Sequence, residues 1–190
     1  MVDKRTGVNG GVGVLPVADV NKNLWAPWRM EYIRSLDQEQ GQSGCFLCDY
    51  WAHPQRDAEN HVVWRGRSAF VVMNRFPYTN GHLLVAVSAH KGDYDAFADE
   101  ELLEMQVLTR DAVRLLRETV RAQGVNVGTN LGHCAGAGLP DHLHAHVVPR
   151  WMGDTNCMAV LGDTRVIPDG LDPLYRELVR NAAALGITDR

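Results

Sequence analysis

Three histidines near the end of the chain alternate with small apolar residues. His142, His144 and His146 lie in the segment DHLHAHVVPR at positions 141–150. Side chains of a β-strand alternate between two faces, so a strand here would place the three imidazoles on one face and the intervening apolar side chains on the other. Three imidazoles on one face are costly unless each has a partner or a chemical role. This segment is therefore the first candidate for a functional site.

Three interpretations of the histidine pattern remain open at this point. Alternation alone can produce three histidines on a solvated strand. A catalytic zinc centre with three histidine ligands is the second, but residues i and i+4 of one strand are about 13 Å apart, so all three cannot bind one ion. The third is nucleophilic catalysis at phosphorus, in which a neutral imidazole attacks and leaves again while a second histidine stabilises charge on the phosphoryl oxygens.

A glycine-rich segment, GHCAGAG at positions 132–138, comes shortly before the three histidines. Loops of this composition can bring backbone amides close to a phosphate group. The loop is a weak signal alone, but beside histidines suited to phosphorus chemistry it favours a phosphate-bearing ligand.

The remaining pattern predicts strands close together in the sequence, with helices outside them. Runs rich in β-forming residues predict strands over 61–64, 69–73, 82–87, 126–131 and 142–149. Apolar residues at helical spacing after an acidic first turn predict a long helix over 99–123, which Gly124 would end. Asp172 as N-cap, followed by Pro173, predicts a last helix that ends near residue 185. This order favours an α+β fold with an antiparallel sheet.

The three histidines and several spaced motifs resemble the histidine triad (HIT) superfamily of nucleotide hydrolases and transferases. The resemblance extends from about residue 24 to 167 and includes Asn74, GHLLV at 81–85 and NLG at 130–132. The segments LWAPWRM at 24–30, HVVPRW at 146–151 and GDTN at 153–156 are similar to bacterial members of the diadenosine tetraphosphate phosphorylase type. The family fold is an antiparallel sheet of about five strands with flanking helices, usually paired as a homodimer.

The resemblance implies a role for each matching residue. His144 would be the nucleophile that attacks the α-phosphate and becomes transiently nucleotidylated. His146 would form a hydrogen bond at the reacting phosphate, and His82 would line the same site. Asn74 would lie near the ribose, and Asn130 near the phosphate or the leaving group. A histidine at the third triad position argues against the related hexose-phosphate uridylyltransferases, which have glutamine there.

One departure from the family pattern concerns the leaving group. Many relatives carry Ser or Thr shortly before the triad, whereas positions 136–140 read GAGLP and offer no hydroxyl. Backbone amides, those of Gly136 and Gly138 among them, are the remaining source of assistance. The expected activity is cleavage of dinucleoside polyphosphates by phosphate or by water. The alternatives are hydrolysis of AMP phosphoramidates or AMP esters, and nucleotide binding without turnover.

Cys45 and Cys48 form a Cys-x-x-Cys pair. The residues alone leave open a structural zinc site, a redox dithiol or two unrelated buried thiols. Zinc-binding members of the HIT family complete such a pair with two histidines, whose positions match His90 and His142. The resemblance therefore implies a structural zinc with two cysteine and two histidine ligands, and no organic cofactor.

The composition is that of an ordinary globular protein. The 190 residues are 45% hydrophobic and 22% charged, with a formal net charge of −4. This charge argues against a surface-wide binder of nucleic acid polymers, and no apolar run reaches the roughly 18 residues of a membrane span. The N-terminal segment lacks the continuous apolar core of a secretory signal, so we expect a cytoplasmic protein with no membrane partner. The family resemblance implies a homodimer with a nucleotide substrate. Residues 1–22 are expected to form a flexible arm, and residues 23–190 a single HIT domain with a C-terminal helical extension.

Overall fold

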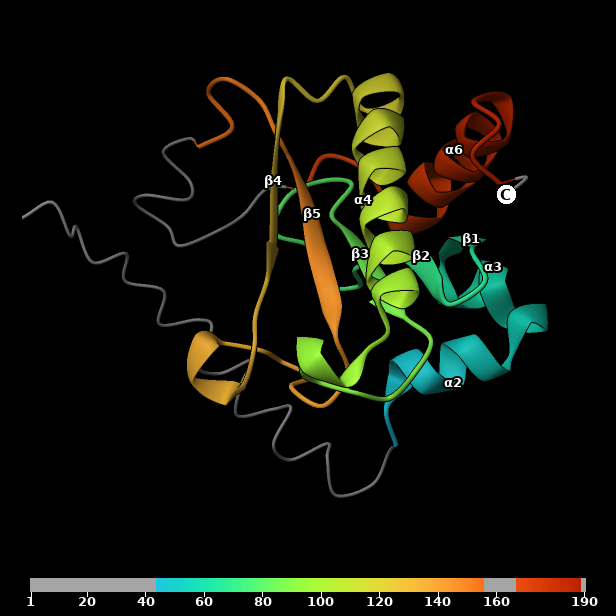
Figure 1. The fold of residues 1–190 in the computed structure, drawn as a ribbon. Helices are drawn as coiled ribbons and strands as arrows, with labels where there is room; N and C mark the ends of the chain where they lie inside the picture. Colours follow the sequence, from blue (N-terminus) through green and yellow to red (C-terminus); the bar gives the residue numbers. More distant parts are fainter. Residues whose placement is uncertain (1–43, 156–166, 189–190) are drawn as a thin grey trace, which may run out of the picture.

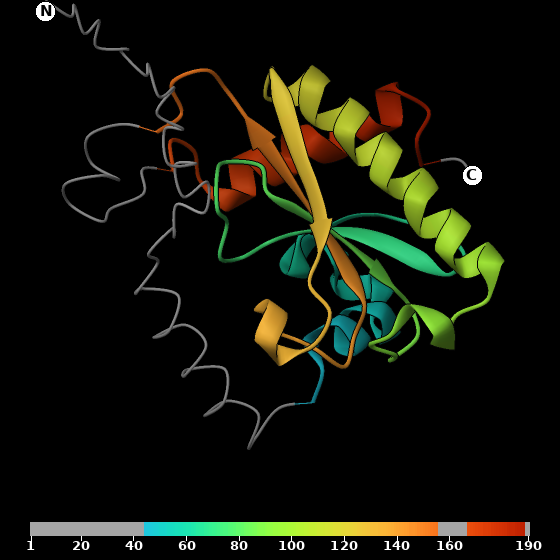
Figure 2. The same ribbon diagram turned by 60° about the vertical axis from the view of Figure 1, so that its left-hand side comes forward.

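The computed structural model describes residues 44–155 and 167–188, and the centre of this part is an antiparallel five-stranded sheet (Figures 1 and 2). The strands follow the spatial order β1-β2-β3-β5-β4. Their bounds are β1 Val62–Arg65, β2 Ala69–Met73, β3 Leu83–Val87, β4 Gly124–Thr129 and β5 His144–Arg150. Every neighbouring pair is antiparallel, which confirms the predicted α+β fold class.

Two long helices cover one face of the sheet. Helix α4 (Asp99–Thr119) and helix α6 (Leu171–Ala184) pack there on a core of apolar side chains from all the strands (Figure 2). Leu143, Ala145 and Val147, the residues that alternate with the three histidines, belong to this core. The histidines therefore point to the opposite face, as the alternation predicts.

The opposite face is covered in part by short helices from the start of the described chain. Helix α2 (Phe46–Ala52) packs Leu47 and Tyr50 on strand residues of a second apolar cluster, and η1 (Pro54–Arg56) and α3 (Asp57–Asn60) lead from it into β1. Two further short helices lie in loops: η2 (Tyr94–Ala96) precedes α4, and η3 (His133–Ala135) lies in the glycine-rich loop. The end of the sheet that carries the histidines is thus framed by α2 and by the loop between β4 and β5.

Several predicted boundaries were wrong. The long helix ends at Thr119, and Gly124 is the first residue of β4 rather than the residue that stops the helix. The chain reverses earlier because Arg121 takes the left-handed conformation (φ 54°) that Gly usually supplies. Helix α6 has Gly170 as its N-cap, and Asp172 lies inside its first turn. The predicted arm at 1–22 lies outside the described residues.

Within the described ranges, no helix is both long enough and apolar enough to cross a membrane.

Candidate functional site

Strand register places two of the triad histidines beside the strand that follows His82. His144 pairs with Ala86 and His146 with Leu84, so both lie in β5 against β3. His142 lies two residues before the first residue of β5 and is fully buried, whereas 7% of the surface of His144 is exposed. The rings of His144 and His146 have centroids 5.1 Å apart at a steep angle. The predicted catalytic residues are therefore neighbours, because β3 and β5 are adjacent in the sheet.

A chain of hydrogen bonds fixes the proton positions of His82 and His146. The backbone N–H of Tyr78 donates to Nδ1 of His82 (3.1 Å), so this nitrogen is an acceptor and the ring proton lies on Nε2. Nε2–H of His82 then donates to Nδ1 of His146 at 3.0 Å. The proton of His146 consequently lies on its Nε2. His146 is thereby assigned as a hydrogen-bond donor through Nε2.

His144 has the opposite arrangement. Its Nδ1 lies 2.8 Å from the carbonyl oxygen of His142, so Nδ1 donates the hydrogen bond and Nε2 carries the lone pair. Burial lowers the pKa of His144 below its ordinary value, although the hydrogen bond to the carbonyl acts in the other direction. The ring is therefore neutral at pH 7, which is the nucleophilic form of an imidazole.

Tyr78 is a site residue that the sequence analysis did not identify. Its ring stacks on His146 (centroids 5.7 Å apart, 17° between planes) and lies 4.6 Å from the ring of His82. Tyr78 lies between the strands predicted over 69–73 and 82–87, and the backbone there aims its amide at His82. The signal available in the sequence was an aromatic residue four positions before the histidine of the GHLLV motif.

The predicted substrate-binding asparagines lie at two loops around these histidines. Asn74 Nδ2 is 3.2 Å from Nδ1 of His82, and its Oδ1 accepts a hydrogen bond from the Phe76 amide (2.9 Å), so Asn74 organises the turn beside His82. Asn130 follows the β4 residue that pairs with Ala145, and its side chain is 3.5 Å from the carbonyl of Gly136.

The glycine-rich loop returns the chain from β4 to β5. Gly136 has a left-handed φ of 83°, which requires a residue without a side-chain penalty, and Gly138 is half-buried two residues later. Leu139 accepts a hydrogen bond from the amide of His142, so the loop ends directly at the first triad histidine. The loop is thus placed at the end of β5 that carries His144.

Cys45, Cys48, His90 and His142 form the metal-binding cluster that the family resemblance implies. One ligand atom from each residue lies within 4.8 Å of the others. Nδ1 of His142 is 3.1 Å from Sγ of Cys45 and 3.4 Å from Sγ of Cys48, and Nδ1 of His90 is 3.4 Å from Sγ of Cys48. A tetrahedral zinc with ordinary bond lengths separates nitrogen and sulfur ligands by about 3.6 Å. The four residues therefore fit a metal ion.

The protonation of the cluster also suits a metal. Nε2–H of His142 donates to the carbonyl of Val87 at 2.7 Å, which directs the Nδ1 lone pair toward the two thiols. Burial lowers the pKa of His142 to about 4, so the ring is neutral. Burial, together with the Cys45 thiol, raises the pKa of Cys48 to about 11. A bound cation would reverse that preference, because metals bind the thiolate.

The remaining described histidines and cysteine lie outside these two clusters. His61 forms an ion pair with Asp172 of α6 (2.7 Å), and His53 lies against Asp49 (3.0 Å). His133 and Cys134 are exposed on η3. None of these residues belongs to the metal-binding cluster of the described part of the chain.

The fold and the site together define a histidine triad protein, and the family model of the HIT domain matches residues 55–152, so the chain belongs to the HIT family. This confirms the resemblance inferred from the motifs. The chain is 37% identical over 163 residues to AP-4-A phosphorylase of Mycobacterium tuberculosis H37Rv, and the match covers 84% of each protein.

Solved structures agree with this assignment. A zinc-bound histidine triad family protein from Mycobacterium smegmatis superimposes with a TM-score of 0.63 at 27% identity, covering 76% of this chain and 96% of that one. The diadenosine triphosphate hydrolase of Plasmodium falciparum superimposes with a TM-score of 0.54 at 16% identity, covering 70% of this chain and 80% of that one. The second likeness shows the fold alone.

Proposed function

We propose that this protein cleaves dinucleoside polyphosphates of the diadenosine tetraphosphate type at the α-phosphate, through a nucleotidyl intermediate on His144. One observation carries the proposal: His144 presents a lone pair on Nε2, whereas the neighbouring His146 presents a proton on Nε2. A nucleophile beside a hydrogen-bond donor is what attack on a phosphoryl group requires. The 37% identity to an AP-4-A phosphorylase bears out the predicted class, a nucleotide phosphorylase or hydrolase.

The first step transfers a nucleotidyl group to the protein. Nε2 of His144 attacks the α-phosphorus, a P–N bond forms, and the bond from the phosphorus to the bridging oxygen breaks. With diadenosine tetraphosphate the leaving group is ATP. Nε2–H of His146, oriented through His82, donates to a phosphoryl oxygen and stabilises the charge that develops there.

The second step releases the nucleotide. An oxygen of inorganic phosphate or of water attacks the same phosphorus, the P–N bond breaks, and His144 recovers its neutral ring. Attack by phosphate gives ADP, and attack by water gives AMP. The relative named a phosphorylase supports phosphate as the acceptor.

A two-part experiment tests the activity and the acceptor. Purified protein is incubated with diadenosine tetraphosphate, with and without inorganic phosphate, and the nucleotides are separated by chromatography. We expect ADP and ATP in equal amounts when phosphate is present. If AMP and ATP form without phosphate as fast as the substrate is cleaved with phosphate, the protein is a hydrolase instead.

The nucleophile is tested by His144→Ala, with His53→Ala as the control because His53 is half-exposed after α2 and pairs with Asp49. Loss of His144 should abolish turnover while nucleotide binding and the fold persist. Near-normal turnover by that variant would refute the mechanism. Tight AMP binding by the unmodified protein, with no cleavage of polyphosphates, phosphoramidates or AMP esters, would favour the binding function that the hydroxyl-free loop at 136–140 suggests.

We also propose that Cys45, Cys48, His90 and His142 hold a structural zinc ion. Two thiolates and two imidazoles are a donor set that zinc prefers, and four protein ligands close the coordination sphere. The ion would join α2 to the start of β5, next to His144. Mass spectrometry should find one zinc per chain, and a chelator should lower the melting temperature. Less than one zinc per chain in protein purified without chelators would contradict this site.

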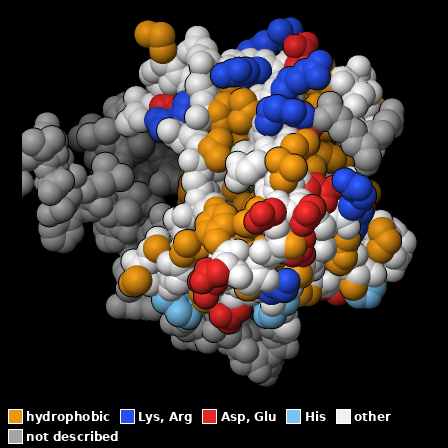
Figure 3. All heavy atoms as spheres, in the orientation of Figure 1, with side chains coloured by type: hydrophobic (Ala, Val, Ile, Leu, Met, Phe, Trp, Pro, Cys, Tyr) orange, Lys and Arg blue, Asp and Glu red, His pale blue; other side chains and the backbone are white. Residues whose placement is uncertain are grey.

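A homodimer through β4 is the quaternary structure that the fold favours. β4 has a single neighbour in the described sheet, and Figure 3 shows hydrophobic side chains grouped on the face where β4 and α4 lie. Val127 of β4 is 51% exposed and Leu103 of α4 is 65% exposed. An edge strand with exposed apolar residues favours association with a second copy. Light scattering should report a dimer, and Val127→Lys should convert it to a monomer.

A further inference from the structure

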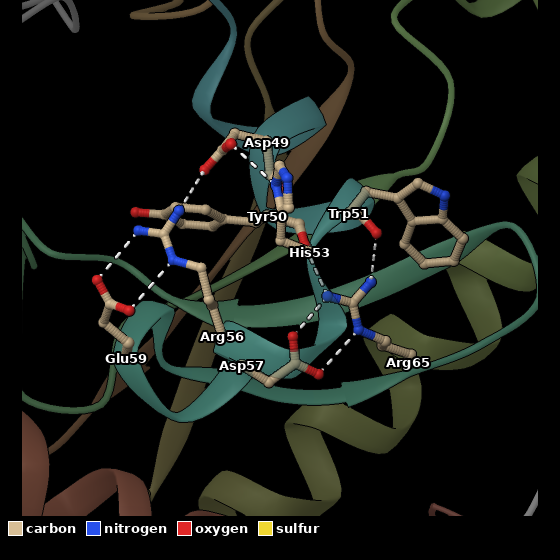
Figure 4. Close-up of polar contacts among 8 residues, drawn as sticks. All are labelled: Asp49, Tyr50, Trp51, His53, Arg56, Asp57, Glu59 and Arg65. Atoms are coloured by element: carbon tan, nitrogen blue, oxygen red, sulfur yellow. Dashed lines mark hydrogen bonds and ion pairs between the residues drawn. The ribbon is translucent and has the colours of Figure 1, made fainter.

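Arg65 of β1 contacts two of the last three carbonyl groups of the helix that carries the cysteine pair (Figure 4). One guanidinium nitrogen donates to the carbonyl of Tyr50 at 2.6 Å, and the other donates to the carbonyl of Trp51 at 3.0 Å. The last carbonyls of a helix have no partner within the helix, and a cation at this end also interacts favourably with the helix dipole. Arg65 thus caps α2 from a neighbouring strand.

Helix α2 depends strongly on such external contacts. It has only seven residues, and Cys45 at its N-cap forms no side-chain cap. Helices of this length are not stable on their own and take their orientation from tertiary contacts. Cys45 is the N-cap and Cys48 lies in the first turn, so any tilt of α2 moves both thiols relative to His142.

Arg65 is itself held in one position. Its Nε and one terminal nitrogen donate to the two carboxylate oxygens of Asp57 at 2.8 and 2.5 Å. The guanidinium carbon lies 5.1 Å from the ring of Trp51 and 5.8 Å from the ring of Phe70. A bidentate carboxylate and two aromatic rings leave the planar group little freedom. The side chain is therefore a rigid link between the sheet and α2.

We propose that Arg65, anchored by Asp57, is a positioning residue for the metal centre. It sets the orientation of α2 so that the thiols of Cys45 and Cys48 meet Nδ1 of His142. This inference rests on the proposed zinc site and extends it, because Arg65 touches none of the four ligand side chains named there. Residues that orient metal ligands from outside typically change metal affinity about 10- to 100-fold when they are replaced.

The test compares Arg65→Lys with Arg56→Lys. Lysine keeps the charge but cannot reach two carbonyls and a carboxylate at once. Arg56 is a stringent control because it also forms ion pairs, with Glu59 of α3 and with Asp49 of α2 (Figure 4). It is half-exposed, and none of the described hydrogen bonds joins its side chain to a carbonyl of α2. Zinc affinity is measured by competition with a chelator, and the geometry of the site is followed by the absorption of the Co²⁺ form.

We expect Arg65→Lys to weaken zinc binding about 10- to 100-fold and to alter the Co²⁺ spectrum, while Arg56→Lys changes neither. Arg65→Lys should also reduce the gain in melting temperature that zinc produces. An equal loss of melting temperature with and without zinc, at unchanged affinity, would show a merely structural role and overturn the inference.

Asp57→Asn provides a second variant in case Arg65→Lys does not fold, since it leaves Arg65 in place and removes only its anchor. Weaker zinc binding in that variant supports the inference, and unchanged binding overturns it. If the wild-type protein binds no zinc, the metal centre and the role of Arg65 both fail. If the wild type binds zinc and both variants bind it equally well, only the role of Arg65 fails.

Discussion

The link from His82 to His146 provides the sharpest prediction of the proposed chemistry. His82 is almost fully buried, at 1% exposure, and donates to Nδ1 of His146. The change His82→Phe keeps a planar ring of similar size but removes both nitrogens. Nδ1 of His146 then loses its donor, and the proton of His146 is no longer confined to Nε2, where it would meet the phosphate.

The expected effect follows from the loss of one hydrogen bond at a buried group. Leaving such a group unsatisfied costs about 1–3 kcal/mol. Since about 1.4 kcal/mol corresponds to a factor of ten in rate, kcat/KM should fall about 5- to 150-fold. The backbone N–H of Tyr78 also loses its acceptor, so the free energy of unfolding should decrease by about 1–3 kcal/mol as well.

Steady-state kinetics with diadenosine tetraphosphate, together with urea denaturation, measures both quantities. His61→Phe is the matched control, because it removes another largely buried imidazole whose partner, Asp172, belongs to α6 on the other side of the sheet. The control should lose stability but keep its kcat/KM. If His82→Phe keeps kcat/KM within about twofold while losing stability, His82 does not orient the donor and the reasoning is refuted.

Two predictions concern acidic residues that stabilise the frame of the site. Burial raises the pKa of Glu104, but hydrogen bonds from the Ser68 hydroxyl and from two backbone amides outweigh burial, so the pKa lies below its ordinary value. The stability that Glu104 contributes is therefore lost as the pH falls through the acid range. Glu104→Gln should reduce the free energy of unfolding, measured by urea denaturation, by about 1–3 kcal/mol. Glu100→Gln should leave it unchanged because Glu100 is exposed. Equal stability of the two variants would contradict this role of Glu104. The Arg150 guanidinium holds the pKa of Asp154 at about 2. Because the carboxylate titrates near pH 4 in the unfolded chain, its contribution is complete above about pH 5, shrinks below that and is lost as the pH falls through about 2. The difference in melting temperature between wild type and Asp154→Asn should therefore shrink steadily between about pH 5 and pH 2, and a difference at pH 2 as large as that at neutral pH would count against the assignment.

Much of the candidate site could be predicted from local sequence, but the hydrogen bonds that orient the histidines could not. Alternation alone placed His142, His144 and His146 on one face, and the structure agrees. The family resemblance supplied His90 as a partner of the cysteines, which geometry supports. Tyr78 was missed because its ring meets His82 and His146 only in the folded chain, and its backbone N–H, which donates to His82, leaves no residue-specific signal.

The error in the predicted end of the long helix also arose from a contact between distant residues. Gly124 was expected to stop the long helix because glycine is the residue that most readily takes a left-handed conformation. Arg121 takes that conformation instead, and the indole of Trp151 donates to the carbonyls of Val120 and Arg121 at the reversal. A contact across 30 positions thus overrode a local preference.

The sequence by itself determined the family and the fold class and singled out the residues proposed to carry the chemistry, because a two-residue period and spaced motifs are properties of the chain. Tertiary structure decided which imidazole nitrogen carries each proton, since that depends on which carbonyl, amide or ring lies opposite. It also decided that Arg65 holds the helix of the cysteine pair, through contacts between β1 and the end of α2. Such contacts depend on strand register and helix packing, which join residues that no local pattern relates.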